Sequence, residues 1–121
     1  MAEELLQPQF AAEHMEPVSI PSVQRAVAHV FDVSLADLTG RHRSRGIALP
    51  RQIAMYLCRT LTPASLPDIG VSFVKTHATV LHAYRQIQSK MEHDPQLKQA
   101  VHKIAQQFRP NGARDVPVLT S

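Results

Sequence analysis

The sequence contains no tryptophan, one cysteine, Cys58, and only four glycines among its 121 residues. A single cysteine cannot form an internal disulfide, so a disulfide-stapled secreted domain is excluded. Aromatics are scarce at 5%, and the 44% hydrophobic content predicts an aliphatic core of packed helices. No stretch approaches the roughly 20 consecutive apolar residues of a membrane span, and no secretory signal is recognisable. We therefore expect a soluble, cytoplasmic protein without a membrane partner.

Positive charge is missing from one part of the chain, and negative charge is scarce in another. The first sixteen residues carry four Glu and no Lys or Arg. Leu38 to Met91 carry eight Lys or Arg against Asp68 alone, a local net charge of 8 − 1 = +7, although the whole chain has only +3. Positive charge concentrated in one part of a protein predicts a polyanionic partner, and nucleic acid is the first candidate.

The length suits one small domain rather than two. We predict a flexible acidic lead over 1–18, a helical domain over 19–108 and a flexible tail over 109–121. Leu5, Leu6 and Phe10 in the lead form a short apolar cluster that can dock on a protein partner. Such clusters more often pack on their own domain or stay disordered, so both alternatives remain open.

Apolar residues recur at helical spacing, which predicts an all-α fold of about six helices. The expected ranges are 21–31, 35–38, 50–61, 66–72, 76–91 and a last helix from 95 whose apolar stripe reaches Phe108. In the first helix we expect Val30 to face the core and Gln24 to face solvent. In the third we expect Arg51 and Gln52 at the exposed amino end, where helix termini attract phosphates.

A basic loop separates the second and third helices. Arg41, Arg43 and Arg45 lie between Gly40 and Gly46 with no apolar residue to pin them against a core. A short basic loop is about as often merely solvated as functional, so this feature alone does not establish a site.

The fourth and fifth helices have the spacing of a helix-turn-helix motif. A short helix is followed by a tight connection and a longer helix, and Lys75, Thr76, His77 and Thr79 cluster at the start of the longer one. In proteins that read DNA, the second helix of such a pair enters the major groove. Helical hairpins are common, so the pattern is only moderately specific.

Four segments in the same order resemble the C-terminal DNA-binding domain, domain IV, of the bacterial replication initiator DnaA. They are Arg-Ser-Arg at 43–45, Pro-Arg-Gln-Ile-Ala-Met at 50–55, Ser-Leu-Pro-Asp-Ile-Gly at 65–70 and His-Ala-Thr-Val-Leu-His-Ala-Tyr-Arg-Gln-Ile at 77–87. The likeness covers about 18–108. It implies a compact helical fold with a helix-turn-helix, similar to that of the Trp repressor, and binding of short origin repeats in double-stranded DNA.

The resemblance also implies which residues contact DNA. Arg43 takes the place of the Arg that enters the minor groove, and Leu66 and Pro67 take the places of a backbone contact to phosphate. The full set expected at DNA is Arg41, Arg43, Arg45, Arg51, Gln52, Leu66, Pro67, Lys75, Thr76, His77 and Thr79.

The chain departs from the family at the turn before the recognition helix. Where the family has Phe-Gly-Gly-Arg-Asp-His-Thr-Thr-Val, residues 73–80 read Phe-Val-Lys-Thr-His-Ala-Thr-Val, one residue shorter. Thr76 replaces an Asp, and Ala78 replaces the first Thr of a pair. An Asp accepts from a cytosine amino group, whereas a Thr hydroxyl bonds to several bases. We therefore predict DNA binding with relaxed or altered base preference.

Catalytic and metal-binding motifs are missing from the sequence. There is no G-x-x-x-x-G-K-[ST] phosphate loop, so the 121 residues do not contain the family's ATPase module and no ATP or other cofactor is expected. His77 and His82 are five residues apart rather than the four that align ligands on a helix, which favours packing or solvation for His82. Cys58 falls on an apolar helix face and is expected to be inert core. We predict a non-enzymatic protein with no metal site.

The function predicted from these observations is control of the initiation of chromosome replication, by a stand-alone relative of the domain that occupies origin-type sites on the nucleoid. Two other classes remain open. The protein can regulate through contacts with the initiator or its inactivating factors, using the altered turn and the acidic lead. It can also act as a helix-turn-helix transcriptional regulator, since fold does not determine function.

Overall fold

The computed structural model of the protein describes residues 16–40 and 46–109. Within these ranges the chain forms six helices and one pair of two-residue strands. In order they are β1 (Glu16–Pro17), α2 (Ile20–Phe31), α3 (Leu35–Thr39), α4 (Ala48–Leu61), α5 (Leu66–Phe73), α6 (His77–His93), α7 (Pro95–Ala105) and β2 (Phe108–Arg109). The predicted all-α fold of about six helices is confirmed.

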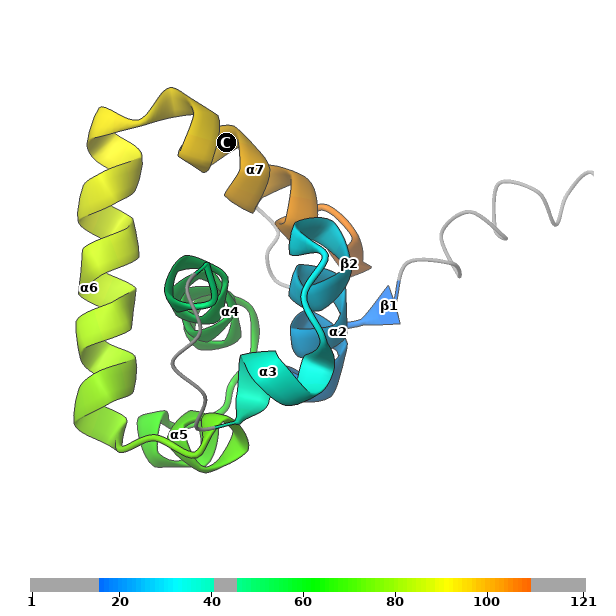
Figure 1. Ribbon diagram of the computed structural model, residues 1–121, viewed down its shortest axis with the longest axis vertical. Helices are drawn as coiled ribbons and strands as arrows, with labels where there is room; N and C mark the ends of the chain where they lie inside the picture. Colours follow the sequence, from blue (N-terminus) through cyan, green and yellow to red (C-terminus); the bar gives the residue numbers. More distant parts are fainter. Residues whose placement is uncertain (1–15, 41–45, 110–121) are drawn as a thin grey trace, which may run out of the picture.

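Helix α4 lies at the centre of the fold. Figure 1 shows it end-on, with α6 along one side, α7 above, α2 opposite α6 and α5 below. Its central position follows from its composition, because it carries apolar side chains on most of its circumference. At most 1% of the surface of each of Ile53, Ala54, Met55, Leu57 and Cys58 is exposed. Burial of this helix on several sides supplies the main hydrophobic stabilisation of the domain.

Side-chain caps define where most helices begin. A Ser, Thr or Asp precedes every described helix except α4, and its side chain accepts a hydrogen bond from a backbone N–H two or three residues later. These bonds satisfy donors that have no partner within the helix. The caps are Ser19, Ser34, Ser65, Thr76 and Asp94.

Two predicted helix boundaries move by two residues. Helix α4 begins at Ala48 rather than at Pro50, which still lies in the first turn, where its missing N–H costs nothing. Helix α6 continues past Met91 to His93. Ala48 and Leu49, the two residues added to α4, are both exposed, so a buried apolar stripe does not indicate them, whereas α6 ends where Asp94 caps α7.

Two predictions for α2 are wrong. Gln24 is buried, and its Nε2 donates to the carbonyl oxygen of Ser72 at 3.0 Å, whereas Val30 is 45% exposed. At 3.6 residues per turn, Gln24 lies between Val27 and Ala28 around the helix axis, inside the buried arc, and Val30 lies at its border. A buried amide needs a partner, and the carbonyl on α5 provides it.

The two ends of the described chain meet. β1 pairs with β2 in parallel, with Glu16 opposite Phe108 and Pro17 opposite Arg109. Phe108 was expected on the last helix. The structure ends α7 at Ala105 and buries Phe108 from the strand instead. An extended segment can still reach the core, because alternate side chains of a strand face the same side.

The described residues show three further features that bear on function. None of their helices is both long and apolar enough to cross a membrane. The Cys58 thiol is completely buried, and burial raises its pKa to about 12, which confirms the prediction of an inert core cysteine. Among the residues of the described ranges, no group of three or more His, Cys, Asp or Glu could hold a metal ion.

Candidate nucleic-acid interface

Helices α5 and α6 are joined by a tight turn that depends on one glycine. Gly70 on α5 packs so closely against the turn that a Cβ there would lie 2.6 Å from the carbonyl oxygen of Lys75. The Lys75 N–H donates to the carbonyl oxygen of Gly70 at 2.8 Å. The backbone of α5 at Gly70 therefore contacts the backbone of the turn at Lys75 directly, and this contact sets the short separation between the two helices.

Val74 ends α5 in the left-handed conformation. Its φ is 56° and its ψ is 46°, and its N–H bonds to carbonyl oxygens at the end of α5. Glycine normally occupies this position after a helix, because a β-branched side chain is strained there. The turn that the sequence comparison found to lack its glycine pair is therefore still formed, with a valine at positive φ.

The exposed start of α6 brings together four of the predicted DNA-contacting residues. Thr76 is the capping residue: its Oγ1 accepts from the N–H of Thr79 at 3.2 Å and lies 3.1 Å from the Thr79 Oγ1. His77 and Thr79 are exposed, and Lys75 in the turn is half-buried. Ammonium, imidazole and hydroxyl groups thus share one helix end, where the first backbone N–H groups have no partner within the helix.

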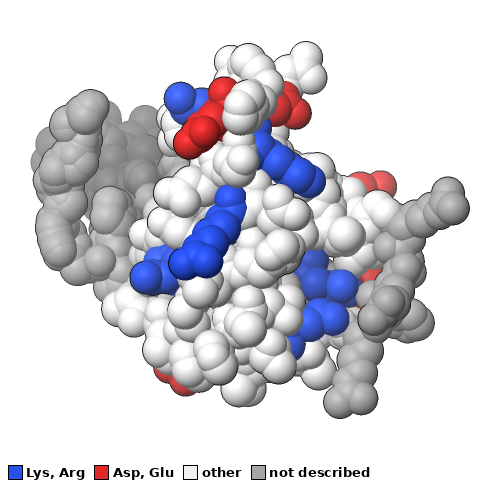
Figure 2. Space-filling view, turned by 90° about the vertical axis from the view of Figure 1, so that its left-hand side faces the viewer, with Lys and Arg blue, Asp and Glu red and all other residues white. Residues whose placement is uncertain are grey.

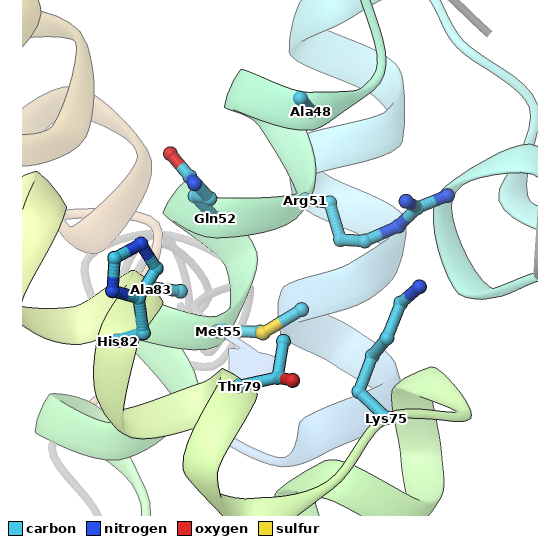
Figure 3. A pocket seen from close by; sticks show the side chains of 8 residues that line it. All are labelled: Ala48, Arg51, Gln52, Met55, Lys75, Thr79, His82 and Ala83. Atoms are coloured by element: carbon cyan, nitrogen blue, oxygen red, sulfur yellow. The ribbon is translucent and has the colours of Figure 1, made fainter. Parts of the chain in front are cut away.

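A hollow of about 160 Å³ lies between the first half of α4 and the start of α6. Figure 3 shows Gln52, Lys75, Thr79 and His82 around it. The remaining lining residues are Ala48, Arg51, Met55 and Ala83. Small-molecule pockets usually measure ~300–1,000 Å³, so this hollow does not favour a metabolite site. Its polar groups instead line a surface continuous with the start of α6.

His82 is the residue at this surface that sequence reasoning missed. Its spacing from His77 directed attention to metal binding, and packing or solvation was the expected outcome. The informative spacing is the one from Thr79, because residues three apart lie on the same helix face. His82 is exposed and shares the hollow with Gln52, so the structure adds it to the candidate interface.

Arg51 does not lie at an exposed helix end, and that prediction is wrong. Only 8% of its surface is exposed. Its Nε donates to the carbonyl oxygen of Leu38 at 2.9 Å and its Nη2 to that of Asp37 at 2.7 Å. Figure 3 shows the side chain directed towards α3, away from Gln52 and His82. Burial lowers the pKa of the guanidinium, and the negative charge of Asp37 opposes that shift.

Leu66 and Pro67 lie in the first turn of α5 rather than in the hollow. Ser65 caps this turn by accepting from the N–H of Asp68 at 3.2 Å. Pro67 has no N–H, so a phosphate at this helix end would be received by the N–H of Leu66. Arg41, Arg43 and Arg45 lie outside the described residues.

Basic side chains are distributed over the face that α6 occupies. Figure 2 shows Lys and Arg at several places on this face, with acidic side chains gathered mainly at one end. On α6 itself, Arg85 and Lys90 are exposed, and Glu92 is the sole acidic residue between His77 and His93. The basic side chains of α6 therefore face solvent, as a surface that attracts a polyanion requires.

A short helix, a glycine-dependent turn and a longer helix with an exposed polar start define the protein as one of the helix-turn-helix class. Residues 20–87 match the family described as "Bacterial dnaA protein helix-turn-helix". This match covers more than half of the chain, which therefore belongs to the family of DnaA helix-turn-helix domains.

Several relatives support the assignment. The chain is 46% identical over 110 residues, 90% of its length, to the chromosomal replication initiator protein DnaA of Levilactobacillus brevis. It is 50% identical over 74% of its length to that of Lactobacillus acidophilus, and 43% identical over 82% to chromosomal replication initiator protein DnaA 2 of Chlamydia pneumoniae. The aligned part is only 24%, 20% and 22% of these relatives, respectively, so the chain spans about a fifth to a quarter of their length.

Proposed function

We propose that this domain binds double-stranded DNA with the start of α6 in the major groove. The observation that carries the proposal is the convergence of Lys75, His77 and Thr79 on one exposed helix end, beside a hollow rimmed by Gln52 and His82. Hydroxyl, imidazole and amide groups bond to base edges, and an ammonium neutralises phosphate. Membership of the DnaA family supports the same conclusion.

The phosphate contacts proposed around this helix come from several segments. Gln52 on α4 and the N–H of Leu66 at the start of α5 contact phosphates beside the helix-turn-helix that α5 and α6 form. Pro67 fixes the direction of the chain at the start of α5. Arg41, Arg43 and Arg45 supply further positive charge, with Arg43 in the minor groove as the family resemblance implies. Each phosphate neutralised adds about 0.9 to the slope of log affinity against log salt concentration.

The base preference proposed for α6 is broader than that of the family. Because the Thr76 hydroxyl bonds to both the N–H and the hydroxyl of Thr79, its proton can point towards Thr79 or towards a base. It can therefore offer either a donor or an acceptor, whereas the carboxylate of the family's Asp only accepts. Relaxed selectivity at that base step follows.

Fluorescence anisotropy with two labelled duplexes tests the binding proposal. One duplex carries the family's origin repeat and the other a scrambled sequence of the same composition. We expect His77→Ala to lose roughly 5- to 150-fold in affinity for the repeat, equivalent to one base contact of about 1–3 kcal/mol. Lys75→Ala should weaken binding to both duplexes and reduce the salt slope by about 1.

Lys98→Ala provides a control of equal charge. Lys98 is exposed on α7, which Figure 1 places at the end of the molecule opposite α5. Its replacement should leave affinity within about twofold. Equal losses for Lys75→Ala and Lys98→Ala would contradict a localised interface. Selectivity for the repeat equal to that of an intact initiator domain would contradict the relaxed base preference.

The cellular role proposed is control of replication initiation, through occupation of origin-type sites on the nucleoid of the bacterial cytoplasm. The role is one of binding rather than catalysis. Recovery of DNA fragments bound in cells tests it, because the fragments should be enriched near the replication origin. Enrichment at promoters throughout the chromosome, with none at the origin, would favour transcriptional regulation.

A second candidate function, regulation through protein contacts with the initiator or its inactivating factors, is favoured by one observation. Val71 is 77% exposed on the outer face of α5, and Val74 in the adjoining turn is 45% exposed. Exposed apolar side chains beside each other are typical of protein contacts. If Val71→Ser abolishes regulation in cells while His77→Ala does not, the protein-contact function is supported over DNA binding.

A further inference from the structure

Gln24 on α2 is a buried polar residue whose hydrogen-bond partner is far away in the sequence. Only 7% of its surface is exposed, and its Nε2 donates to the carbonyl oxygen of Ser72 at 3.0 Å. Ser72 is the second-last residue of α5, where carbonyl groups have no partner within the helix. The carbonyls of Gly70 and Val71 just before it accept from backbone N–H groups of the turn. Gln24 therefore caps the end of α5 from another helix.

The backbone of α2 around Gln24 is fixed in the core. Val23 precedes it, Val27 follows three residues later, and both are completely buried. Helix α2 packs mainly against the central helix α4, whereas α5 packs mainly against α6, with which it forms the helix-turn-helix. The bond from Gln24 to Ser72 therefore ties α5 to a helix with which it does not otherwise pack closely.

The position of α5 determines where α6 begins. A Cβ on Gly70 of α5 would lie 2.6 Å from the carbonyl oxygen of Lys75 and 3.3 Å from that of Thr76. Thr76 in turn caps α6 by accepting from the N–H of Thr79. A displacement of α5 is therefore transmitted through backbone contacts to the exposed start of α6.

We propose that Gln24 is a positioning residue for DNA binding. Its bond to Ser72 holds the end of α5, and thereby the start of α6, in the orientation in which His77 reaches a base edge. Gln24 itself does not contact DNA, because its side chain is buried between helices. The inference rests on the proposed function, since it concerns how the same helix end is oriented. An amide suits this task, because it donates to a carbonyl oxygen without bringing a charge into the core.

A double-mutant cycle on the complete chain tests the proposal. Gln24→Met keeps the approximate size of the side chain but removes the donor. It is measured alone and together with His77→Ala, by anisotropy with the repeat duplex and with concentrations corrected for the folded fraction. We expect Gln24→Met to lose roughly fivefold or more in affinity when His77 is present, and less than about twofold when that residue is already Ala. The salt slope should not change, because no phosphate contact is removed.

Two control variants separate positioning from a general loss of stability. Val101→Ala removes buried apolar atoms from α7, which Figure 1 places at the end of the molecule opposite α5. It should lower the midpoint of urea unfolding but leave affinity within about twofold. Gln99→Met makes the same chemical change as Gln24→Met at an exposed position of α7, and should alter neither quantity. If Gln24→Met does not fold, Gln24→Ala takes its place, because it leaves room for a water at the Ser72 carbonyl.

Three results would overturn the proposal. An affinity that is unchanged by loss of the donor would show that the bond does not position the interface. An equal loss in both backgrounds would show that Gln24 does not act through His77. Equal losses for Gln24→Met and Val101→Ala would assign the effect to stability alone. If the unaltered chain binds no duplex, the proposed function fails together with this inference, whereas any of the three results in a chain that does bind refutes this inference alone.

Discussion

Gly70 and Lys75 approach so closely that no side chain fits between them: a Cβ on residue 70 would be 2.6 Å from the Lys75 carbonyl oxygen and 3.2 Å from the carbonyl carbon of Thr76. Gly70→Ala should therefore separate α5 from the turn and reduce the free energy of unfolding by about 1–3 kcal/mol, the usual cost of overpacking. Urea unfolding measures the change.

Val71→Ala is the control for this substitution, since Val71 is the next residue and mostly exposed. It should be neutral or slightly stabilising, because Ala favours helix more than Val does. If Gly70→Ala is equally neutral, the close approach does not constrain the turn.

Val74 is strained at its positive φ, and Val74→Gly should relieve that strain. The left-handed conformation costs a non-glycine residue about 1–2 kcal/mol, against which glycine loses about 0.5–1 kcal/mol of chain entropy. The expected net result is a gain of about 0–1.5 kcal/mol, or up to a few degrees in Tm. A decrease in Tm would show that contacts of the half-buried valine side chain outweigh its backbone strain.

Thr76 allows helix capping and base selectivity to be tested separately. Thr76→Ala removes the acceptor for the Thr79 N–H and should destabilise the domain by about 1 kcal/mol. Thr76→Asp keeps an acceptor and places a negative charge at the helix start, so stability should be maintained. The same variant should raise the ratio of affinities for repeat and scrambled duplexes by roughly tenfold. An unchanged ratio would show that residue 76 does not contact a base.

Because the pKa of the buried Cys58 thiol is raised, we expect the protein to lose stability at alkaline pH. The pKa is 9.0 for an ordinary thiol and about 12 in the folded protein. Between these values the folded state retains a proton that the unfolded state has released, so this contribution decreases as pH rises through 9 towards 12. From pH 7 to about 10.5 the loss is roughly 2 kcal/mol.

Cys58→Ala isolates this effect. The variant should be less stable than the unaltered protein at pH 7, because a buried sulfur is removed, but should lose less stability on going to alkaline pH. Urea unfolding at both pH values provides the comparison. The same alkaline loss in both proteins would assign it to other groups, such as Tyr56, whose pKa is also raised by burial.

Local sequence features were sufficient to predict those parts of the structure that depend on interactions between residues close in the chain. Ser19, Ser34 and Ser65 precede apolar spacing in the sequence and cap the helices that follow. Ile69 and Phe73 recur at helical spacing, and both are completely buried. Capping and helix periodicity involve residues within about four positions of one another, so they can be inferred without knowledge of the fold.

Predictions failed where the partner is distant in the sequence. Gln24 is a polar residue that periodicity assigns to solvent, but its partner Ser72 is 48 residues away. Phe108 follows the period of the last helix, but its strand pairs with β1 at the other end of the chain. In each case a long-range contact outweighs the local pattern.

The sequence by itself determined the class of fold, the helix-turn-helix and the family, because apolar spacing, caps and the four motifs are all short-range features. Only the tertiary structure decided which polar groups are at the surface. Arg51 is buried because α3 presents two carbonyl oxygens to it, and His82 faces the hollow because the first half of α4 lies beside the start of α6. Both results depend on how helices pack across the core, which the order of residues within any one helix does not specify.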